Sequence, residues 1–404
     1  MPIDRVDPPR EGAIGLVLTG GGARAAYQVG VLAGIMDILD PDRRPGFANP
    51  FGIICGSSAG AVNAGALGCR ANDVHAAVDH LEQLWGNLHT GDVYHADGPR
   101  LFLTGVRWLM LLMLGWAMPG ADRQQPRALL DNTPLRGLLE DTLDFERLQV
   151  NLDAGHLQSL AITAAAYTTG EHLTFYQSTG TIEPWSRPLR RAIPCNLEVD
   201  HLLASSSIPF IFQAQALNVH SMIQWCGDGS MRQLAPLSPA IHLGAKKICI
   251  IGTGHRDDTH PEEGEKQPPY PSIAQIGGHT LSNIFLDSLS MDVERMQRIN
   301  DLLARLPANE LKSQSLRPVS TFAITPSRSL DEIALAHIDQ MPRAARTLFR
   351  VLGVSSSSGP TTGGALISYL LFEASFTQAL IRLGRADSMS RVEEVKAFFK
   401  ETQQ

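Results

Sequence analysis

Short apolar runs alternate along the chain with stretches of helical period. The runs have the length and composition of buried strands and cover residues 13–19, 51–55, 160–166, 171–176, 222–226, 247–252 and 319–324. The clearest helical stretch follows Gly22 and ends before Pro41, and an amphipathic one runs from Asn283 to Leu303. This alternation predicts an α/β fold with a mostly parallel sheet and helices on both faces.

One segment breaks the pattern, because residues 101–118 are almost wholly apolar. The segment has about the length of a membrane span, but Arg107 and two glycines interrupt it and Pro119 closes it. A buried core helix is one interpretation. A lid or interfacial helix over a catalytic groove is another, since Trp108 and Trp116 suit a lipid interface. A transmembrane helix is the least favoured of the three.

The pentapeptide Gly56–Gly60 has the pattern G-x-S-x-G and directly follows the apolar run 51–55. A strand, a sharp turn and a helix of small residues are the context of a nucleophile elbow. Small neighbours are needed because the turn holds the central serine in a strained backbone conformation. Ser58 is therefore the candidate nucleophile, and a glycine-rich turn without chemistry is the alternative.

A second glycine motif, Gly20-Gly21-Gly22-Ala23-Arg24, stands between the strand 13–19 and the first helical stretch. Its backbone N–H groups lie at a positive helix terminus and could hold an oxyanion or a phosphate. The loop also fits the dinucleotide-binding pattern, which requires an acidic residue at the end of the second strand. Asp37 and Asp40 have about the right spacing but fall at the end of the helix, so this interpretation is less favoured.

An aspartate between glycines, Gly227-Asp228-Gly229-Ser230, follows the expected strand 222–226. Such a carboxylate can approach another loop closely and act as a general base toward a serine hydroxyl. Asp-Gly is also an ordinary turn dipeptide, so this motif alone would decide nothing.

The three motifs, in this order and context, resemble those of the bacterial patatin-like phospholipases. Supporting stretches are Ala204–Phe210 before the aspartate and Pro236–Ile248 after it. The resemblance covers about residues 12–330 and extends more weakly to the stretch Ser368–Phe372.

The resemblance implies a three-layer α/β/α core with a mostly parallel sheet, carrying a helical insertion and C-terminal helices. The hydrolase domain would span residues 12–330, with the apolar helical insertion at about 89–130. Residues 331–404 would form a C-terminal helical extension packed on the core.

The resemblance also implies a lipid acyl hydrolase of the phospholipase A or lysophospholipase type, with no metal and no cofactor. Ser58 would be the nucleophile of a Ser-Asp dyad and Asp228 its general base, with an acyl-serine intermediate. Backbone N–H groups of Gly20, Gly21 and Gly22 would form the oxyanion hole. Arg24 would hold that loop or add positive charge. Gly56 and Gly60 would be the glycines of the nucleophile elbow.

Three alternatives stay open. His255 follows the strand 247–252, so Ser58, Asp228 and His255 also stand in the order of an α/β-hydrolase triad, which would suit a general esterase or lipase. A nucleotide-binding protein would use the Gly20–Gly22 loop instead. An inactive lipid-binding scaffold is disfavoured because both Ser58 and Asp228 are present. Ser230 departs from the family, which usually has Gly or Ala after Asp-Gly.

The composition of the chain limits the classes of molecule that it is expected to bind. The chain has 404 residues, 44% of them hydrophobic, and a net charge of −7, which argues against broad attraction to nucleic acid. Arg187, Arg190 and Arg191 form a small basic cluster whose simplest interpretation is a solvated face.

An odd count of five cysteines favours reduced thiols. Residues 1–12 lack the apolar core of a signal peptide. We therefore expect a cytoplasmic enzyme with a lipid or phospholipid substrate and peripheral membrane contact through 101–118. The oligomeric state is left open.

Overall fold

The computed structural model describes residues 13–96, 98, 128–255, 272–285, 287–307, 310, 316–351, 354 and 364–400. The apolar segment 101–118 lies outside the described residues. So does most of the expected insertion at about 89–130, of which the short helix α4 (Thr90–Val93) and the two ends are described.

The described residues form one sheet of ten strands in the order β10-β9-β1-β2-β3-β4-β6-β5, with β8 pairing to β3 and β7 pairing to β8. Strands β1, β2, β3, β9 and β10 are parallel to their neighbours in this group, whereas β4 and β8 run antiparallel to β3. Their bounds are β1 (Ile14–Leu18), β2 (Phe51–Ser57), β3 (Ser159–Ala166), β4 (His172–Ser178), β5 (Ser186–Arg187), β6 (Arg190–Pro194), β7 (Gln215–Val219), β8 (Met222–Asp228), β9 (Lys247–Ile251) and β10 (Ser320–Ile324).

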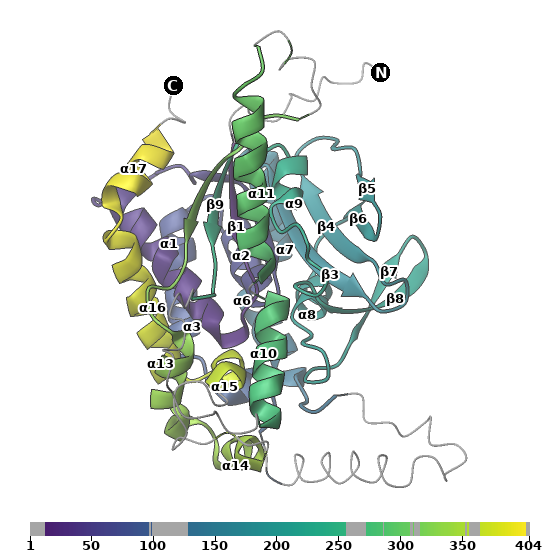
Figure 1. Ribbon diagram of the computed structural model, residues 1–404, viewed down its shortest axis with the longest axis vertical. Coiled ribbons are helices and arrows are strands. Elements are labelled where there is room, and N and C mark those ends of the chain that lie inside the picture. Colours follow the sequence, from purple (N-terminus) through teal and green to yellow (C-terminus); the bar gives the residue numbers. More distant parts are fainter. Residues whose placement is uncertain are drawn as a thin grey trace, which may run out of the picture.

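Helices cover both faces of this sheet, as the sequence predicts (Figure 1). Along β1, Leu16 and Leu18 enter the core beneath α1 and α2, while Val17 enters the core beneath α9 and α11. The two cores make the fold a three-layer α/β/α arrangement. The helices are α1 (Ala26–Leu39), α2 (Ala59–Cys69), α3 (Val74–Gly86), α6 (Thr133–Thr142), α7 (Phe145–Asp153), α8 (Val199–Ser205), α9 (Ser238–His242), α10 (Ile273–Phe285), α11 (Asp287–Leu303), α13 (Leu330–Ala336), α14 (Arg343–Val351), α15 (Gly364–Leu370), α16 (Ala374–Met389) and α17 (Val392–Lys400).

The C-terminal helices pack against the first helix rather than standing apart. α16 lies along α1, and α17 lies on the same side of the sheet (Figure 1). The hydroxyl of Tyr27 in α1 donates to Oδ2 of Asp387 in α16 at 2.9 Å. α15 contacts the short 3-10 helix η1 (Gly22–Ala25), which begins in the glycine loop. Residues near the end of the chain therefore support a loop near its beginning.

All seven predicted strands are present, and three strands were not predicted. β5 and β6 lie at one edge of the sheet and contain three arginines and a proline. Among the described strands β7 pairs only with β8, and its buried Leu217 and Val219 alternate with the exposed Ala216 and Asn218. Polar residues fit an edge or a two-stranded ribbon, because one face of such a strand meets water. The apolar-run criterion misses strands with such polar positions.

Candidate active site

Strand β3 places two motifs from distant parts of the chain side by side. Thr163 of β3 pairs with Ser57, the last residue of β2. Ala164, the next residue of β3, pairs with Asp228 at the end of β8. The ends of β2 and β8 therefore meet on one template strand, and Ser58 follows directly after Ser57.

Ser58 occupies the turn between β2 and α2 with φ 54° and ψ −132°, a strained conformation for a residue with a side chain. Its Oγ donates to Oδ2 of Asp228 at 2.6 Å. Ser58 is also the N-cap of α2, so the positive end of that helix lies beside the hydroxyl. The strand, the sharp turn and the helix expected around Ser58 are thus present.

Both elbow glycines lie at close approaches of the backbone. A Cβ on Gly60 would lie 2.5 Å from the carbonyl oxygen of Leu18, and one on Gly56 would lie 2.5 Å from the carbonyl oxygen of Gly60. A larger residue at Gly60 would therefore push α2 away from β1, and one at Gly56 would push α2 away from β2.

Asp228 is fully buried, and its two carboxylate oxygens have different partners. Oδ2 accepts from Ser58, and Oδ1 accepts from the backbone N–H of Ser230 at 2.8 Å. Burial raises the pKa of Asp228 to about 7, although the Ser58 and Ser230 hydrogen bonds oppose the rise. A carboxyl group that titrates near neutral pH is suited to accept and return a proton.

Two serines before β8, Ser205 and Ser207, hold the two motifs together. The backbone N–H of Ser58 donates to Oγ of Ser205 at 2.8 Å. The backbone N–H of Gly229 donates to the carbonyl oxygen of the same Ser205 at 3.0 Å, and that of Asp228 donates to Ser207 at 2.9 Å. Ser205 thereby bridges the turn at Ser58 and the turn at Asp228.

His172, at the start of β4, supports the aspartate turn from the other side. Its Nε2 donates to the carbonyl oxygen of Gly229 at 3.0 Å, and Thr163 Oγ1 donates to the same oxygen at 3.3 Å. Burial lowers the pKa of His172 to about 4, so the ring is neutral at pH 7. No sequence motif singled out this histidine.

The glycine loop lies near Ser58, because Gly22 and Ser58 line one pocket. Gly22 has φ +55°, and a Cβ on it would lie 2.2 Å from the carbonyl oxygen of Tyr369 in α15. Gly21 is the N-cap of η1, and the carbonyl oxygen of Gly20 accepts from Thr253 Oγ1 at 2.6 Å. The first N–H groups of a helical turn have no acceptor within it, so they are available to a ligand.

Arg24 holds this loop against the C-terminal helices. Its Nε donates to Ser368 Oγ at 2.8 Å, and a terminal nitrogen donates to Asp331 Oδ1 at 2.5 Å. The guanidinium also lies over the ring of Tyr369 at 3.9 Å from the centroid. Of the two roles that the resemblance implies for Arg24, these contacts favour the structural one.

A comparison with known protein families identifies the family of the chain. Residues 16–241 match the family model described as patatin-like phospholipase. The chain belongs to the patatin-like phospholipase family. A lipid hydrolase with a lipid substrate is therefore the activity class of this chain.

Other comparisons add little to the patatin-like assignment. Among solved structures, the chain is similar to the crystal structure of VipD from Legionella pneumophila at 13% identity, covering 93% of this chain and 67% of that one. The TM-score is 0.30, so this likeness carries no argument. No curated protein matches the chain.

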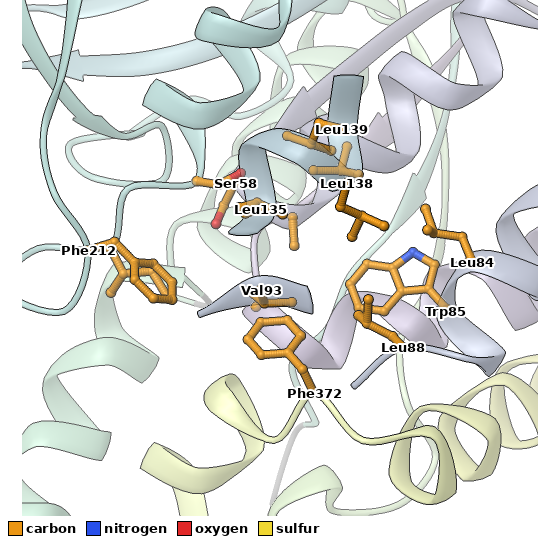
Figure 2. Close-up of a pocket in the computed structure, with 15 residues that line it drawn as sticks. Ser58, Leu84, Trp85, Leu88, Val93, Leu135, Leu138, Leu139, Phe212 and Phe372 are labelled. Atoms are coloured by element: carbon orange, nitrogen blue, oxygen red, sulfur yellow. The ribbon is translucent and has the colours of Figure 1, made fainter. Parts of the chain in front are cut away.

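An apolar pocket begins at Ser58 of the patatin-like site (Figure 2). It runs between helices on the face of the sheet that α1 covers. About 550 Å³ of space lies between its walls, open solvent at the mouth included. Figure 2 shows Ser58 and Phe212 toward one end, and Leu84 and Trp85 toward the other. Other lining residues are Gly22, Ala59, Val62, Leu88, Val93, Leu135, Leu138, Leu139, Ser206, Ile208 and Phe372.

Trp85 is fixed by buried polar groups. Its Nε1 donates to Asn63 Oδ1 at 2.8 Å, and Asn63 Nδ2 donates to Gln28 Oε1 at 2.9 Å. Gln28 in turn donates to the carbonyl oxygen of Thr19 at 2.8 Å. These bonds hold one wall of the pocket rigid, and the sequence motifs gave no sign of it.

Residues central to the alternative functions bond elsewhere. Asp228 accepts hydrogen bonds from Ser58 and Ser230, whereas His255 Nδ1 donates to the carbonyl oxygen of Pro326 at 2.9 Å. Asp37, which the dinucleotide pattern would need near the ribose, accepts from Arg385 of α16 at 2.8 Å.

Two further observations concern only the part of the chain that the structure describes. It holds no group of three or more His, Cys, Asp or Glu side chains that could bind a metal ion. No single described helix has the length and apolarity to cross a bilayer; α15 and α16 reach that threshold only as a pair bent by 97°.

Proposed function

We propose that the chain is a lipid acyl hydrolase of the phospholipase A or lysophospholipase type that uses Ser58 and Asp228 as a catalytic dyad. The observation that carries the proposal is the 2.6 Å hydrogen bond from Ser58 Oγ to Asp228 Oδ2 at the end of an apolar pocket. A serine hydroxyl becomes nucleophilic when a base takes its proton, and Asp228 is the base in contact with it.

In the proposed acylation step, Oγ of Ser58 attacks the ester carbonyl carbon while its proton moves to Asp228. Backbone N–H groups of Gly20, Gly21 and Gly22 stabilise the negative oxygen of the tetrahedral intermediate. Losing one such donor costs about 3–4 kcal/mol in a comparable site. The bond to the alcohol then breaks, and Asp228 returns the proton to the leaving oxygen.

In deacylation a water molecule attacks acyl-Ser58, and Asp228 accepts its proton. The free fatty acid leaves as the serine recovers its hydrogen. The apolar walls that begin at Ser58 suit an acyl chain, because they replace water around it. This fit favours long-chain esters over the small esters of a general esterase.

A fluorophosphonate probe with mass mapping tests the nucleophile. The label should form on Ser58, and Ser58→Ala should abolish both labelling and ester hydrolysis while the fold is retained. Ser57→Ala is the matched control, since Ser57 Oγ bonds to Thr163 and Gln233 rather than to Asp228. Labelling that persists on another serine in Ser58→Ala would overturn the proposal.

Defined glycerophospholipids and lysophospholipids test the substrate class. Release of a fatty acid, with the phosphate-bearing product intact, is the expected result for either lipid. Turnover of short soluble esters alone would return the enzyme to the general esterases.

A further inference from the structure

The register of the sheet shows which turns surround the catalytic pair. β2 ends beside Ser58, and β3 runs parallel to it, so both strands end at the same edge of the sheet. β4 is antiparallel to β3 and β6 is parallel to β4, so both begin at that edge. β8 runs antiparallel to β3 and reaches it at Ala166, so the β7–β8 ribbon extends beyond that edge. We call this edge of the sheet the catalytic edge.

Exposed apolar side chains gather at the catalytic edge. Among the residues that the structure describes, fourteen large hydrophobic side chains are exposed, and five of them belong to these turns or to the ribbon. A sixth, Phe210, lies in the connection between α8 and β7. The exposed fraction reaches 82% for Phe210 and 66% for Ile223. We call the group the apolar rim; its members are Tyr167, Leu189, Phe210, Met222, Ile223 and Trp225.

The apolar rim is continuous with the proposed active site. Strand β8 leads from Ile223 directly to Asp228. Phe210 lies two residues before Phe212, which lines the pocket toward its Ser58 end (Figure 2). The rim therefore lies around the end of the pocket at which the ester would react, and not on a remote surface.

Cationic side chains accompany the rim, although the whole chain carries a net charge of −7. Arg187 and Arg190 pair across the β5–β6 ladder beside Leu189. Exposed Arg232 donates to the carbonyl oxygen of Gly170, in the turn that also carries Tyr167. Residues 213–227, which include most of the ribbon, contain no acidic side chain. Arginine with Trp and Tyr is the composition that suits a phosphate-bearing lipid interface.

We propose that the apolar rim docks the enzyme on the surface of an anionic lipid bilayer. Phe210, Ile223 and Trp225 would enter the interface, and Arg187 and Arg190 would meet headgroup phosphates. This orientation places the end of the pocket near Ser58 against the lipid. The inference rests on the proposed lipid substrate and is independent of the segment 101–118.

Vesicle sedimentation tests the docking surface without turnover. The protein carries Ser58→Ala, and the vesicles contain phosphatidylcholine with phosphatidylglycerol. Adding Phe210→Ser and Ile223→Ser should weaken the vesicle partition coefficient at least tenfold. Val150→Ser with Leu302→Ser is the matched control, because these exposed apolar residues lie on α7 and α11, away from the rim.

The arginines have a separate readout. Arg187→Gln with Arg190→Gln should weaken binding to the anionic vesicles and have little effect with pure phosphatidylcholine. Raising salt from ~0.1 M to ~0.5 M should reproduce this loss in the protein with both arginines, because surface charges are screened. If the Phe210 and Ile223 substitutions lower the melting temperature, the two arginine substitutions test the docking surface instead.

Enzyme with Ser58 intact separates docking from catalysis. The Phe210 and Ile223 substitutions should raise the apparent KM on vesicles and leave kcat on a soluble ester unchanged. Unaltered vesicle binding in the rim variant, or an equal loss in the control, would overturn the docking proposal. So would a dimer, seen by analytical ultracentrifugation, that the rim substitutions dissociate. Hydrolysis by Ser58→Ala would instead defeat the proposed function and leave the sedimentation result intact.

Discussion

His172 Nε2 donates to the carbonyl oxygen of Gly229, one residue after Asp228, at 3.0 Å. This bond links β4 to the turn that carries the proposed base. Because the histidine is buried and neutral, it acts as a fixed donor rather than as a charge. We infer that His172 positions Asp228 without touching the substrate.

Replacing His172 tests this role. His172→Phe should lower kcat by about 10–100-fold with a smaller change in KM, since a buried carbonyl that loses a donor costs about 1–3 kcal/mol. His172→Gln keeps an N–H donor and should recover part of the rate. A purely structural residue would behave differently: melting temperature and kcat would fall together, and glutamine would restore neither selectively.

The dyad and triad alternatives are separated by comparing two variants on one ester. Asp228→Asn preserves shape but removes the base, so the rate should fall by about 10²–10⁴-fold. His255→Ala should keep most activity, because His255 bonds to Pro326 and not to Asp228. Equal losses in the two variants, with both folds retained, would establish the triad.

The raised pKa of Asp228 gives a pH profile. The base must be ionised, so kcat/KM for a soluble ester should rise with pH and reach half its maximum near the pKa of about 7. Steady-state rates between pH 5 and 9, roughly two units either side, test this. A half-maximum near pH 4, with the fold intact, would contradict the buried base.

The same pKa predicts a stability change. The folded pKa of about 7 exceeds the pKa of about 4 that an aspartate has in an unfolded chain, so the stability that protonated Asp228 contributes is present below about pH 4 and is lost as pH rises through 7. Asp228→Asn cannot ionise and should gain stability over the wild type across that window. The gain should level off above pH 7 at up to roughly 4 kcal/mol. Urea melts of both proteins at each pH measure it.

The far end of the pocket should limit acyl chain length. Leu138, a half-buried residue of α6, lines the pocket close to Leu84 and away from Ser58 (Figure 2). Leu138→Trp should fill this end and reduce turnover of long-chain esters by about tenfold or more, since overpacking costs about 1–3 kcal/mol. Leu138→Ala should tolerate chains at least as long as the wild type does.

An ester series of increasing chain length, measured at constant enzyme, provides the readout. Short esters should be hydrolysed equally by both Leu138 variants and by the control Val150→Trp. An unchanged chain-length profile in Leu138→Trp would show that the acyl chain lies elsewhere.

Local patterns predicted the buried half of this molecule. The strand 13–19, the elbow at Ser58 and the turn at Asp228 each carry their information within a few neighbouring residues, through apolar runs and small residues. The pairing of the strands in the sheet then brings these motifs together, and no local sequence pattern shows that pairing. The domain boundary expected at residue 330 stays a prediction.

Features that depend on register could not be read from one sequence. His172 reaches Gly229 because β4 pairs with β3 at one particular offset, and a shift of one residue would turn its ring to the other face. Trp85 and Phe372 line one pocket although they are far apart in the chain. Apolar residues at such positions look like any other core residue until the helices are packed.

The attachment of β8 bears on how activity should be lost. Only three positions of β8 pair with β3, whereas β2 pairs with β3 at five. The β7–β8 ribbon could therefore open as a local unit while the parallel strands stay closed. Ser58 would remain in its turn, but its base would be withdrawn. Mild denaturant should then abolish activity reversibly before the circular dichroism of the protein changes. In hydrogen exchange, the amides of β8 should exchange before those of β2.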